Sequence, residues 1–487
     1  MGGTDSVLIE ENSQVRLPPA GAQPTAPLQS TCTHMRTWQT IGWATLTVIG
    51  MALISLAHRS HLARSTANIL PVAAITLSAN VASPKTPADR AIQVAEAEIT
   101  ISPQRSEGCV SLANAYMRKV RESGDAEYYL RAEAAVRCAL EITPDSFEGL
   151  RTLTWVQTGK HEFRAAQATA ERLSIQYPED PLVYGLLGDA AVELGEYESA
   201  EKTFEKMVDL HPGLASYSRI SYIRELYGDV QGAIEMMTLA VKAGSRRDPE
   251  PLAWGLVQLG NLHFNQGHLQ EAEVAHQKAL AVFPHYYQAL AALGRVRAAQ
   301  QRYPEAIDLY QKAVAAVPAP DTIAALGDLF LLTGRQDEAE KQYILVEYIE
   351  HVNEINQITY TRQLALFYAD HNRKLNEAVK LAEAERARRN DIYTEDALAW
   401  AYYKIGRFTD AWQSMKQALR LGTKDASLFF HAGMIAYGLG EERRAKYYLH
   451  RALETNPHFS LSGVELARVT LAEIEQRLVA QGEPHVR

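Results

Sequence analysis

The chain has 487 residues, of which 47% are hydrophobic and 22% are charged, close to the usage of ordinary packed proteins. Its formal net charge is -9 and no basic stripe accompanies it, which excludes nucleic acid as the main partner because phosphate contacts need clustered lysine and arginine. With only 3 cysteines the chain is not a scaffold built from disulfides, although a single bridge remains open.

Residues 1–36 mix glycine, proline, serine, threonine and acidic residues without periodicity, which is typical of a disordered tail. The segment 37–58 that follows contains no Asp, Glu, Lys or Arg. At 1.5 Å per residue a helix of this length spans roughly 33 Å, and the hydrocarbon core of a bilayer is about 30 Å thick. The segment therefore predicts one transmembrane helix that anchors the chain.

A secretory signal is the competing interpretation of the same segment. Ser55 and Ala57 are small residues at the spacing that a signal peptidase reads, and Met35 would then start a short basic region. The length of the apolar run favours the uncleaved anchor. Arg59 follows the segment, and a basic residue there weakly favours a carboxyl-terminal side that faces the cytoplasm. A short amino-terminal tail, however, more often stays inside the cell, which would place the repeats outside. We expect a single-pass membrane protein with an extracytoplasmic repeat domain, the alternatives being export after signal cleavage and a domain that faces the cytoplasm.

Residues 59–104 are rich in alanine, serine and threonine and read as a flexible linker. Within this segment, Asp89 to Glu98 is expected to begin a helix that covers the domain that follows.

One pattern then recurs from residue 105 to residue 459, and residues 180–212 contain its best copy. Its most regular mark is an alanine after a turn, and successive alanines are 33 to 39 residues apart. Two helices cross so closely at such an alanine that a larger side chain would separate them. The ten alanines are Ala132, Ala166, Ala200, Ala233, Ala272, Ala306, Ala339, Ala378, Ala411 and Ala445.

The best copy also places an aromatic residue, a Leu-Gly pair, Ala200, Phe204 and a closing Pro212 in the order of a known motif. It resembles the tetratricopeptide repeat (TPR), a helix-turn-helix unit of about 34 residues. The resemblance implies an all-α protein, a right-handed α-solenoid of about ten TPR units, preceded here by the one transmembrane helix. Residues 460–487 are predicted to form a capping helix and a tail, because an array must cover its last apolar face. The two gaps of 39 residues predict longer loops near 243–251 and 350–357.

No catalytic motif is found in the sequence, so we expect a protein that is not an enzyme, with no cofactor, no bound metal and no small-molecule substrate. His263 and His276 occupy the two large positions of one repeat, where a metal pair is conceivable but simple packing is favoured. Cys109 and Cys138 fall on the two helices of the first repeat, so a bridge between them is geometrically possible. Such a bridge would indicate an oxidising compartment.

The TPR resemblance implies that the first helix of each repeat lines a concave groove, and these positions are the candidate partner-binding residues. Towards the carboxyl end they form an aromatic run, and in the middle repeats they are polar and largely acidic; packing between repeats is the alternative for the aromatics. The aromatic positions are Tyr360, Phe367, Tyr393, Trp400, Tyr403, Phe430 and Tyr437. The polar positions are Asp189, Glu193, Glu225, Asn261, Asn265, Arg295 and Asp328.

These observations predict a membrane-tethered scaffold that binds a protein or peptide partner in its groove. The alternative is an accessory or assembly subunit of a membrane enzyme or transporter complex. In either case the membrane is contacted through residues 37–58.

Overall fold

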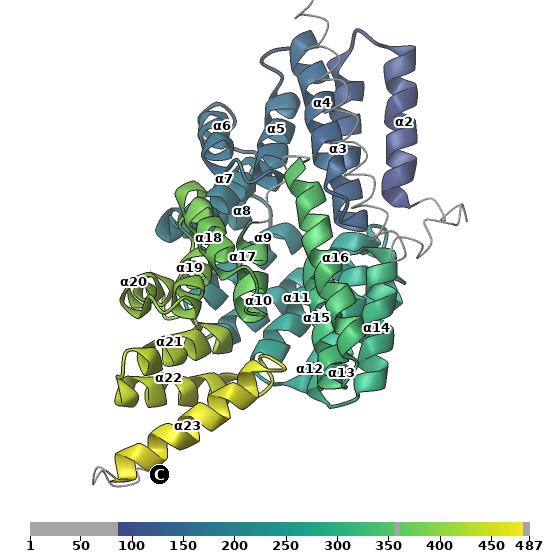
Figure 1. The fold of residues 1–487 in the computed structure, drawn as a ribbon. Helices are drawn as coiled ribbons and strands as arrows, with labels where there is room; N and C mark the ends of the chain where they lie inside the picture. The colour runs from purple at the N-terminus through teal and green to yellow at the C-terminus, as the bar shows by residue number, and fades with distance from the viewer. Residues whose placement is uncertain (1–85, 356–360, 481–487) are drawn as a thin grey trace, which may run out of the picture. The chain divides into compact units, whose positions relative to one another are not determined.

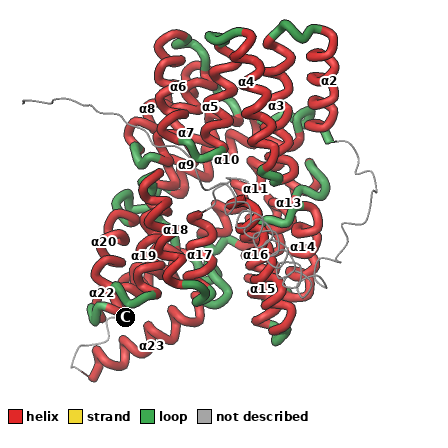
Figure 2. Tube along the Cα trace, turned by 45° about the horizontal axis from the view of Figure 1, so that its top comes forward, coloured by secondary structure: helices red, strands yellow, loops and turns green. Residues whose placement is uncertain are grey.

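The structure, a computed structural model, describes residues 86–355 and 361–480. These residues form 22 α-helices and no strand, labelled as in Figure 1 and seen again as red tubes in Figure 2. The helices are α2 (Pro87–Ile101), α3 (Ser106–Ser123), α4 (Glu127–Ile142), α5 (Phe147–Gly159), α6 (Phe163–Gln176), α7 (Pro181–Glu193), α8 (Tyr197–Leu210), α9 (Leu214–Leu226), α10 (Val230–Ala243), α11 (Pro249–Asn265), α12 (Leu269–Val282), α13 (Tyr287–Ala299), α14 (Tyr303–Ala316), α15 (Pro320–Leu332), α16 (Gln336–Ile355), α17 (Thr361–Asp370), α18 (Leu375–Arg388), α19 (Ile392–Lys404), α20 (Phe408–Ala418), α21 (Ala426–Gly438), α22 (Glu442–Thr455) and α23 (Gly463–Ala480).

Helices α3 to α22 form ten consecutive helix pairs, and each pair is one of the predicted repeats. All ten alanines of the register are buried, with exposed fractions between 0% and 2%. A large side chain that follows this alanine on the second helix packs against a small residue of the first helix. Phe204 packs on Gly188 in this way, and Tyr310 packs on Gly294. The close approach of the two helices therefore explains the repeating pattern.

Several first helices begin at a side chain that caps the free backbone N–H groups of the first turn. The carboxylate of Asp180 accepts from the N–H groups of Leu182 and Val183, and Asp391 and Asp425 cap α19 and α21 in the same way. Such caps fix where each repeat begins and stabilise a helix by about 1 kcal/mol.

The ends of the array hold two further helices. α23 packs on α22 and buries Ala467 and Ile474, as predicted for a capping helix. α2 lies within the segment predicted as a linker and packs on α3, so that linker ends before Pro87. One predicted loop is present between α10 and α11, whereas the prediction of a loop from residue 350 was wrong, because α16 continues to Ile355.

No helix among residues 86–355 and 361–480 is both long and apolar enough to cross a bilayer. The predicted transmembrane segment 37–58, the predicted tail 1–36 and the last residues 481–487 lie outside the described residues.

Repeats far apart in the sequence are in contact, because the array winds back onto itself. The turn inside the third repeat, at Gly195, meets the loop after the eighth repeat at Asn390. In the same way the turn at Gly228 in the fourth repeat meets Gly422 after the ninth repeat. One hydrophobic core joins side chains of α7 to α9 with those of α13 to α21. An ideal solenoid contacts only its neighbours, so this second set of contacts is an addition to the repeat fold. We call it the seam; in Figure 1, α18 and α19 lie beside α7 to α9.

Candidate functional site

The inner face of the array carries polar bonds that join successive first helices. Side-chain hydrogen bonds of this kind join seven of the nine successive pairs of first helices, counting His371 directly after α17, and we call this series the polar ladder. Its bonds are Thr152 to Asn114 (3.2 Å), Arg219 to Asp189 (2.6 and 2.8 Å), Asn265 to Glu225 (3.4 Å), Arg295 to Asn261 (2.9 Å), His371 to Asp328 (2.8 Å), Trp400 to Asp370 (2.7 Å) and His431 to Asp396 (2.8 Å). The predicted contacts Asp189, Asn261 and Asn265 all lie on this face, and each is already bonded within the array.

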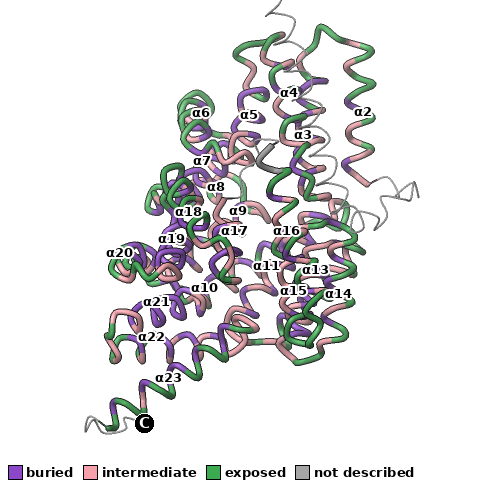
Figure 3. The backbone as a smooth tube through the Cα atoms, in the orientation of Figure 1, coloured by how far each residue is buried: buried purple, intermediate pink, exposed green. Residues whose placement is uncertain are grey.

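Three of the predicted aromatic anchors are buried instead of lining an open groove. Phe367, Trp400 and Phe430 expose only 7%, 3% and 5% of their surface. The Trp400 ring stacks between Tyr403 and His431, with ring centroids 4.8 and 4.2 Å away, and its Nε1–H donates to Asp370. These three side chains therefore hold repeats together, which corrects the predicted aromatic run. The backbone tube of α19 and α21 is largely purple in Figure 3, the colour of buried residues.

The remaining aromatic positions divide into three cases. Tyr437 is half-buried, and its hydroxyl donates to Glu473 and accepts from Arg477, both on the capping helix. Tyr393 and Tyr403 are half-buried on α19. Tyr360 lies outside the described residues.

Four side chains, from α9, α19 and the N-cap of α21, lie close enough to influence one another's pKa. We call Tyr222, Glu225, Tyr393 and Asp425 the seam patch. The pKa of Glu225 is raised to about 7, chiefly by burial and also by the Asp425 carboxylate, while the hydrogen bond from the Asn265 amide opposes the shift. Burial also raises the pKa of both tyrosines, and the nearby carboxylates add to the effect. Tyr222 nevertheless exposes 38% of its surface, so the patch can be reached from solvent.

Sequence reasoning placed Glu225 and Tyr393 on the inner face but did not find Tyr222 and Asp425. No local signal marks these two residues, because what brings them to the patch is the contact between distant repeats.

Glu193, another predicted groove residue, belongs to the seam. Its carboxylate accepts from Arg389 at 2.6 Å, although 196 positions separate the two residues. Burial raises the pKa of Glu193, and the Arg389 guanidinium opposes that shift. Arg389 is 3% exposed and also pairs with Glu385 and with Asp391, which pairs in addition with Arg362 at 2.9 Å, so two guanidinium groups compensate three carboxylates. Next to this cluster, the N–H of Ile392 donates to the Tyr197 hydroxyl at 2.8 Å.

The histidine pair lies in the core of the fifth repeat. The His276 ring packs on Gly260, is fully buried, and has a pKa lowered to about 3, mainly by burial. Among the residues that the structure covers, no three His, Cys, Asp or Glu side chains are grouped to hold a metal ion. The position of His276 against Gly260 is that of a packed core side chain, and His263 beside it is half-buried.

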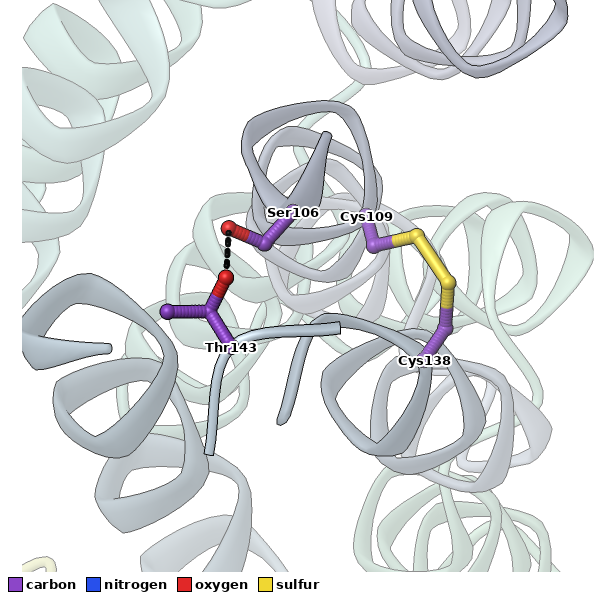
Figure 4. The surroundings of a disulfide bond; sticks show 4 residues. All are labelled: Ser106, Cys109, Cys138 and Thr143. Carbon is purple, nitrogen blue, oxygen red and sulfur yellow. Dashed lines mark hydrogen bonds between the residues drawn. A yellow bond between two sulfur atoms is a disulfide. The ribbon is translucent and has the colours of Figure 1, made fainter. Parts of the chain in front are cut away.

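Cys109 of α3 and Cys138 of α4 form a disulfide bond, with their Cα atoms 6.1 Å apart. Figure 4 shows the bond beside the Ser106 to Thr143 hydrogen bond, which joins the same two helices. The bridge that the sequence left open is thus formed in the first repeat.

A hollow of about 820 Å³ lies beside this bridge, between α4, the turn that joins α5 to α6, and the end of α18. Its charged side chains have both signs, and Glu133, Lys160 and Glu162 already pair with one another. The hollow therefore presents no concentrated charge to a ligand.

Comparison with known proteins agrees with this geometry. A family model described as tetratricopeptide repeat matches residues 159–215 and 257–319. The chain carries tetratricopeptide repeats. The matched residues contain the second helix of the second repeat, the third repeat, most of the fifth and the sixth repeat, and the other pairs share their buried alanine.

Two curated relatives match about half of the chain. Anaphase-promoting complex subunit 3 of Schizosaccharomyces pombe is 24% identical over 241 residues, which are 47% of this chain and 35% of that protein. Protein O-mannosyl-transferase TMTC1 of Homo sapiens is 26% identical over 232 residues, which are 46% of this chain and 25% of that protein. The chain thus spans about a third and a quarter of the lengths of these relatives.

Two solved structures are also similar. The crystal structure of MamA is 19% identical with a TM-score of 0.28, and it covers 33% of this chain and 91% of its own. The crystal structure of PilW, described as a widely conserved type IV pilus biogenesis factor, is 16% identical with a TM-score of 0.35, and it covers 42% of this chain and 92% of its own.

Proposed function

We propose that this protein is a non-enzymatic scaffold, tethered to a membrane, whose TPR array binds a protein or peptide partner on its inner face. The seam patch carries the proposal. Two tyrosines and two carboxyl groups act on one another electrostatically there; Arg362 acts on both tyrosines, but the groups that shift the pKa of Glu225 include no cation. A basic or hydrogen-bond-donating side chain of a partner would relieve the repulsion between Glu225 and Asp425.

The membrane tether rests on the apolar segment 37–58 and on its length. The disulfide between Cys109 and Cys138 supports a repeat domain on the extracytoplasmic side, because disulfides persist in oxidising compartments. Export after cleavage would fit the same disulfide, whereas a cytoplasmic domain would not. Protease added outside intact cells should cut the repeats, and cell fractionation should keep them with the membrane; release of the repeats into the soluble fraction would favour the signal peptide.

The inner-face proposal is tested by capture of partners from detergent-solubilised membranes with the full chain. Tyr222→Ala with Glu225→Gln should abolish binding of at least one partner that the wild type retains. The matched control is Tyr447→Ala with Glu454→Gln, which changes the same residue types on the exposed surface of α22. A partner set that is unchanged by the inner-face variant would contradict the proposal. Trp400→Ala is not suited to this test, because Trp400 is core and its loss reports on folding.

An accessory subunit of a membrane enzyme or transporter complex is the second candidate. A line of exposed apolar side chains on α16 favours it, since Ile344, Tyr348 and Val352 expose 48%, 62% and 36% of their surface. A permanent partner would cover this line. Co-purification with one membrane complex in fixed stoichiometry, lost on Tyr348→Asp and kept in the inner-face variant, would establish this candidate over the first.

A further inference from the structure

The two edges of the wound array differ in what covers them. The turns inside the first, third, fourth and fifth repeats each meet the loop that lies five repeats further on. A β-carbon at Gly124 would touch Val317, and the corresponding contacts of Gly195, Gly228 and Gly267 are with Asn390, Gly422 and Pro457. A β-carbon at Gly334, Gly406 or Gly440, in the seventh, ninth and tenth repeats, would meet nothing within 4 Å.

Each chain is therefore left with two uncovered edges of opposite kind. The turn edge consists of the turns inside the sixth to tenth repeats, at residues 300–302, 333–335, 371–374, 405–407 and 439–441. The loop edge consists of the loops after α2, α4, α6, α8 and α10, at residues 102–105, 143–146, 177–180, 211–213 and 244–248. Within the chain, edges of these two kinds pair with each other along the seam.

The terminal helices behave as two halves of a repeat. α23 takes the place of a first helix, because it packs on α21 and α22 and Arg477 donates to Tyr437 as the next bond of the inner face. α2 takes the place of a second helix that precedes the first repeat and packs on α3. Within the described residues neither helix has the other half of its repeat.

Both terminal helices also leave apolar side chains uncovered. On α2, Val94 and Ile101 expose 60% and 80% of their surface, on the side opposite the buried Ala88 and Ala95. On α23, Leu466 and Val469 expose 45% and 47%.

We propose that a second copy of this chain docks head to tail, so that α2 of one copy completes the repeat that α23 of the other begins. The loop edge of the first copy then covers the turn edge of the second, which extends the seam from one chain to the next. Contacts of this heterologous kind add copies in line.

The register that follows brings opposite charges together. Within one chain, each turn of the seam meets the loop that lies five repeats further on. We count α23 of one copy and α2 of the next as an eleventh repeat. The turn of the seventh repeat, with Arg335, then meets the loop with Asp145 in the next copy. The turn of the eighth repeat, with Lys374, meets the loop with Glu179. The turn of the tenth repeat, with Glu441, meets the loop with Arg246. These three pairs involve six side chains that lie at the surface of the single chain.

The other two turns of the turn edge do not place two unpaired charges of the same sign against each other. The sixth turn, with Arg302, meets the loop that ends in Arg105, and these arginines pair with Glu305 and Glu107 of their own chain. The ninth turn, with Arg407, meets the loop after the third repeat. Arg335, Lys374 and Glu441 also have pairs within their own chain, and exposed pairs of this kind exchange partners at a cost of less than about 1 kcal/mol.

Cysteine cross-linking of full chains in detergent tests the register. In a Cys32→Ser background, one preparation carries Glu179→Cys and a second, with a larger tag, carries Lys374→Cys. Mixed under mild oxidation, the two should give a covalent heterodimer at least about tenfold faster than Glu179→Cys mixed with Lys312→Cys, because docking raises the local thiol concentration. Lys312 is exposed on α14, outside both edges.

Charge-reversal variants distinguish the proposed pairing of turns and loops from nonspecific association. Lys374→Glu should lower the concentration-dependent association seen in sedimentation, and Lys374→Glu combined with Glu179→Lys should restore it. Ile101→Asp in α2 should abolish association. Equal cross-linking of matched and control pairs would overturn the proposal, as would an unchanged monomer at all concentrations, which would mean that another part of the chain or another partner covers these edges.

Discussion

The turn at Gly228 and the turn at Gly406 have the same local conformation but different surroundings. Both glycines have a positive φ, 76° and 79°. A β-carbon at Gly228 would lie 2.6 Å from the carbonyl oxygen of Gly422, whereas one at Gly406 would meet nothing within 4 Å. The difference teaches that the repeat sequence sets each turn, while the winding of the whole array decides which turns become part of a second interface. The following predictions compare the covered turns with the uncovered ones.

The largest effect is expected at Arg389, which lies in the loop that covers the third repeat. Arg389→Met leaves the carboxylates of Glu193 and Glu385 without their buried cation and Asp391 with Arg362 alone, and should lower the free energy of unfolding by about 3–5 kcal/mol. Arg407→Met at an uncovered turn removes the exposed pairs with Asp410 and Glu383 and the contact with the Tyr402 ring, and should change the free energy of unfolding by less than about 1 kcal/mol. Urea denaturation measures both. Similar losses in the two variants would mean that the seam does not stabilise the array.

The glycine pair itself gives the next effect. Gly406→Ala forces a left-handed conformation on alanine, at a cost of about 1–2 kcal/mol. Gly228→Ala adds a collision with the Gly422 backbone, so the expected loss is about 2–4 kcal/mol. The comparison uses thermal and urea unfolding of the two variants side by side. A larger loss of stability in Gly406→Ala than in Gly228→Ala would contradict this prediction.

The stability of the seam should depend on pH through Glu225. This residue precedes the turn at Gly228, and the Asp425 carboxylate acts on it. Its pKa is raised to about 7 in the folded chain, so the folded state binds the proton more tightly than the unfolded state does. The stability from this group is present below its unfolded pKa of about 4.5 and is lost as the pH rises through 7.

Replacing this carboxyl by an amide, Glu225→Gln, removes the titration. Relative to the wild type the variant should gain about 1–3 kcal/mol of stability between pH 5 and pH 8. Glu454→Gln, outside the inner face, is the control and should follow the wild type. If the Glu225→Gln variant and the wild type show parallel stability curves over this range, the seam patch is not coupled to protons.

The repeats could be predicted from the sequence because their determinants are local. The ten alanines and the capping helix follow from a spacing of about 34 residues and from the need to cover an apolar face. Two of the four residues of the seam patch, Glu225 and Tyr393, were also placed on the inner face from the repeat spacing.

The seam could not be predicted in this way. Which loop meets which turn depends on small rotations between neighbouring repeats that accumulate over the array, and no motif encodes their sum. The burial of Phe367, Trp400 and Phe430 could not be predicted for a related reason. Trp400 lies one residue after the small position at Ala399, where a slight rotation of the helix decides between groove and core. Here the ring is enclosed by Tyr403 and His431 of the same and the next first helix.

The central claim is that distant repeats are bonded along the seam, and the backbone amide of Ile392 tests it most directly. Ile392 is the first residue of α19 and has no hydrogen-bond acceptor within its own helix, but its N–H donates to the hydroxyl of Tyr197. Phe408 is the first residue of α20, at an uncovered turn, and serves as the reference.

The measurement is residue-resolved hydrogen exchange of the full chain and of its Tyr197→Phe variant. We predict slow exchange at Ile392, fast exchange at Phe408, and loss of protection at Ile392 in the variant while the overall helix content is unchanged. Exchange at Ile392 as fast as at Phe408 in the wild type would contradict the seam, and with it the proposal that the seam continues into a second copy.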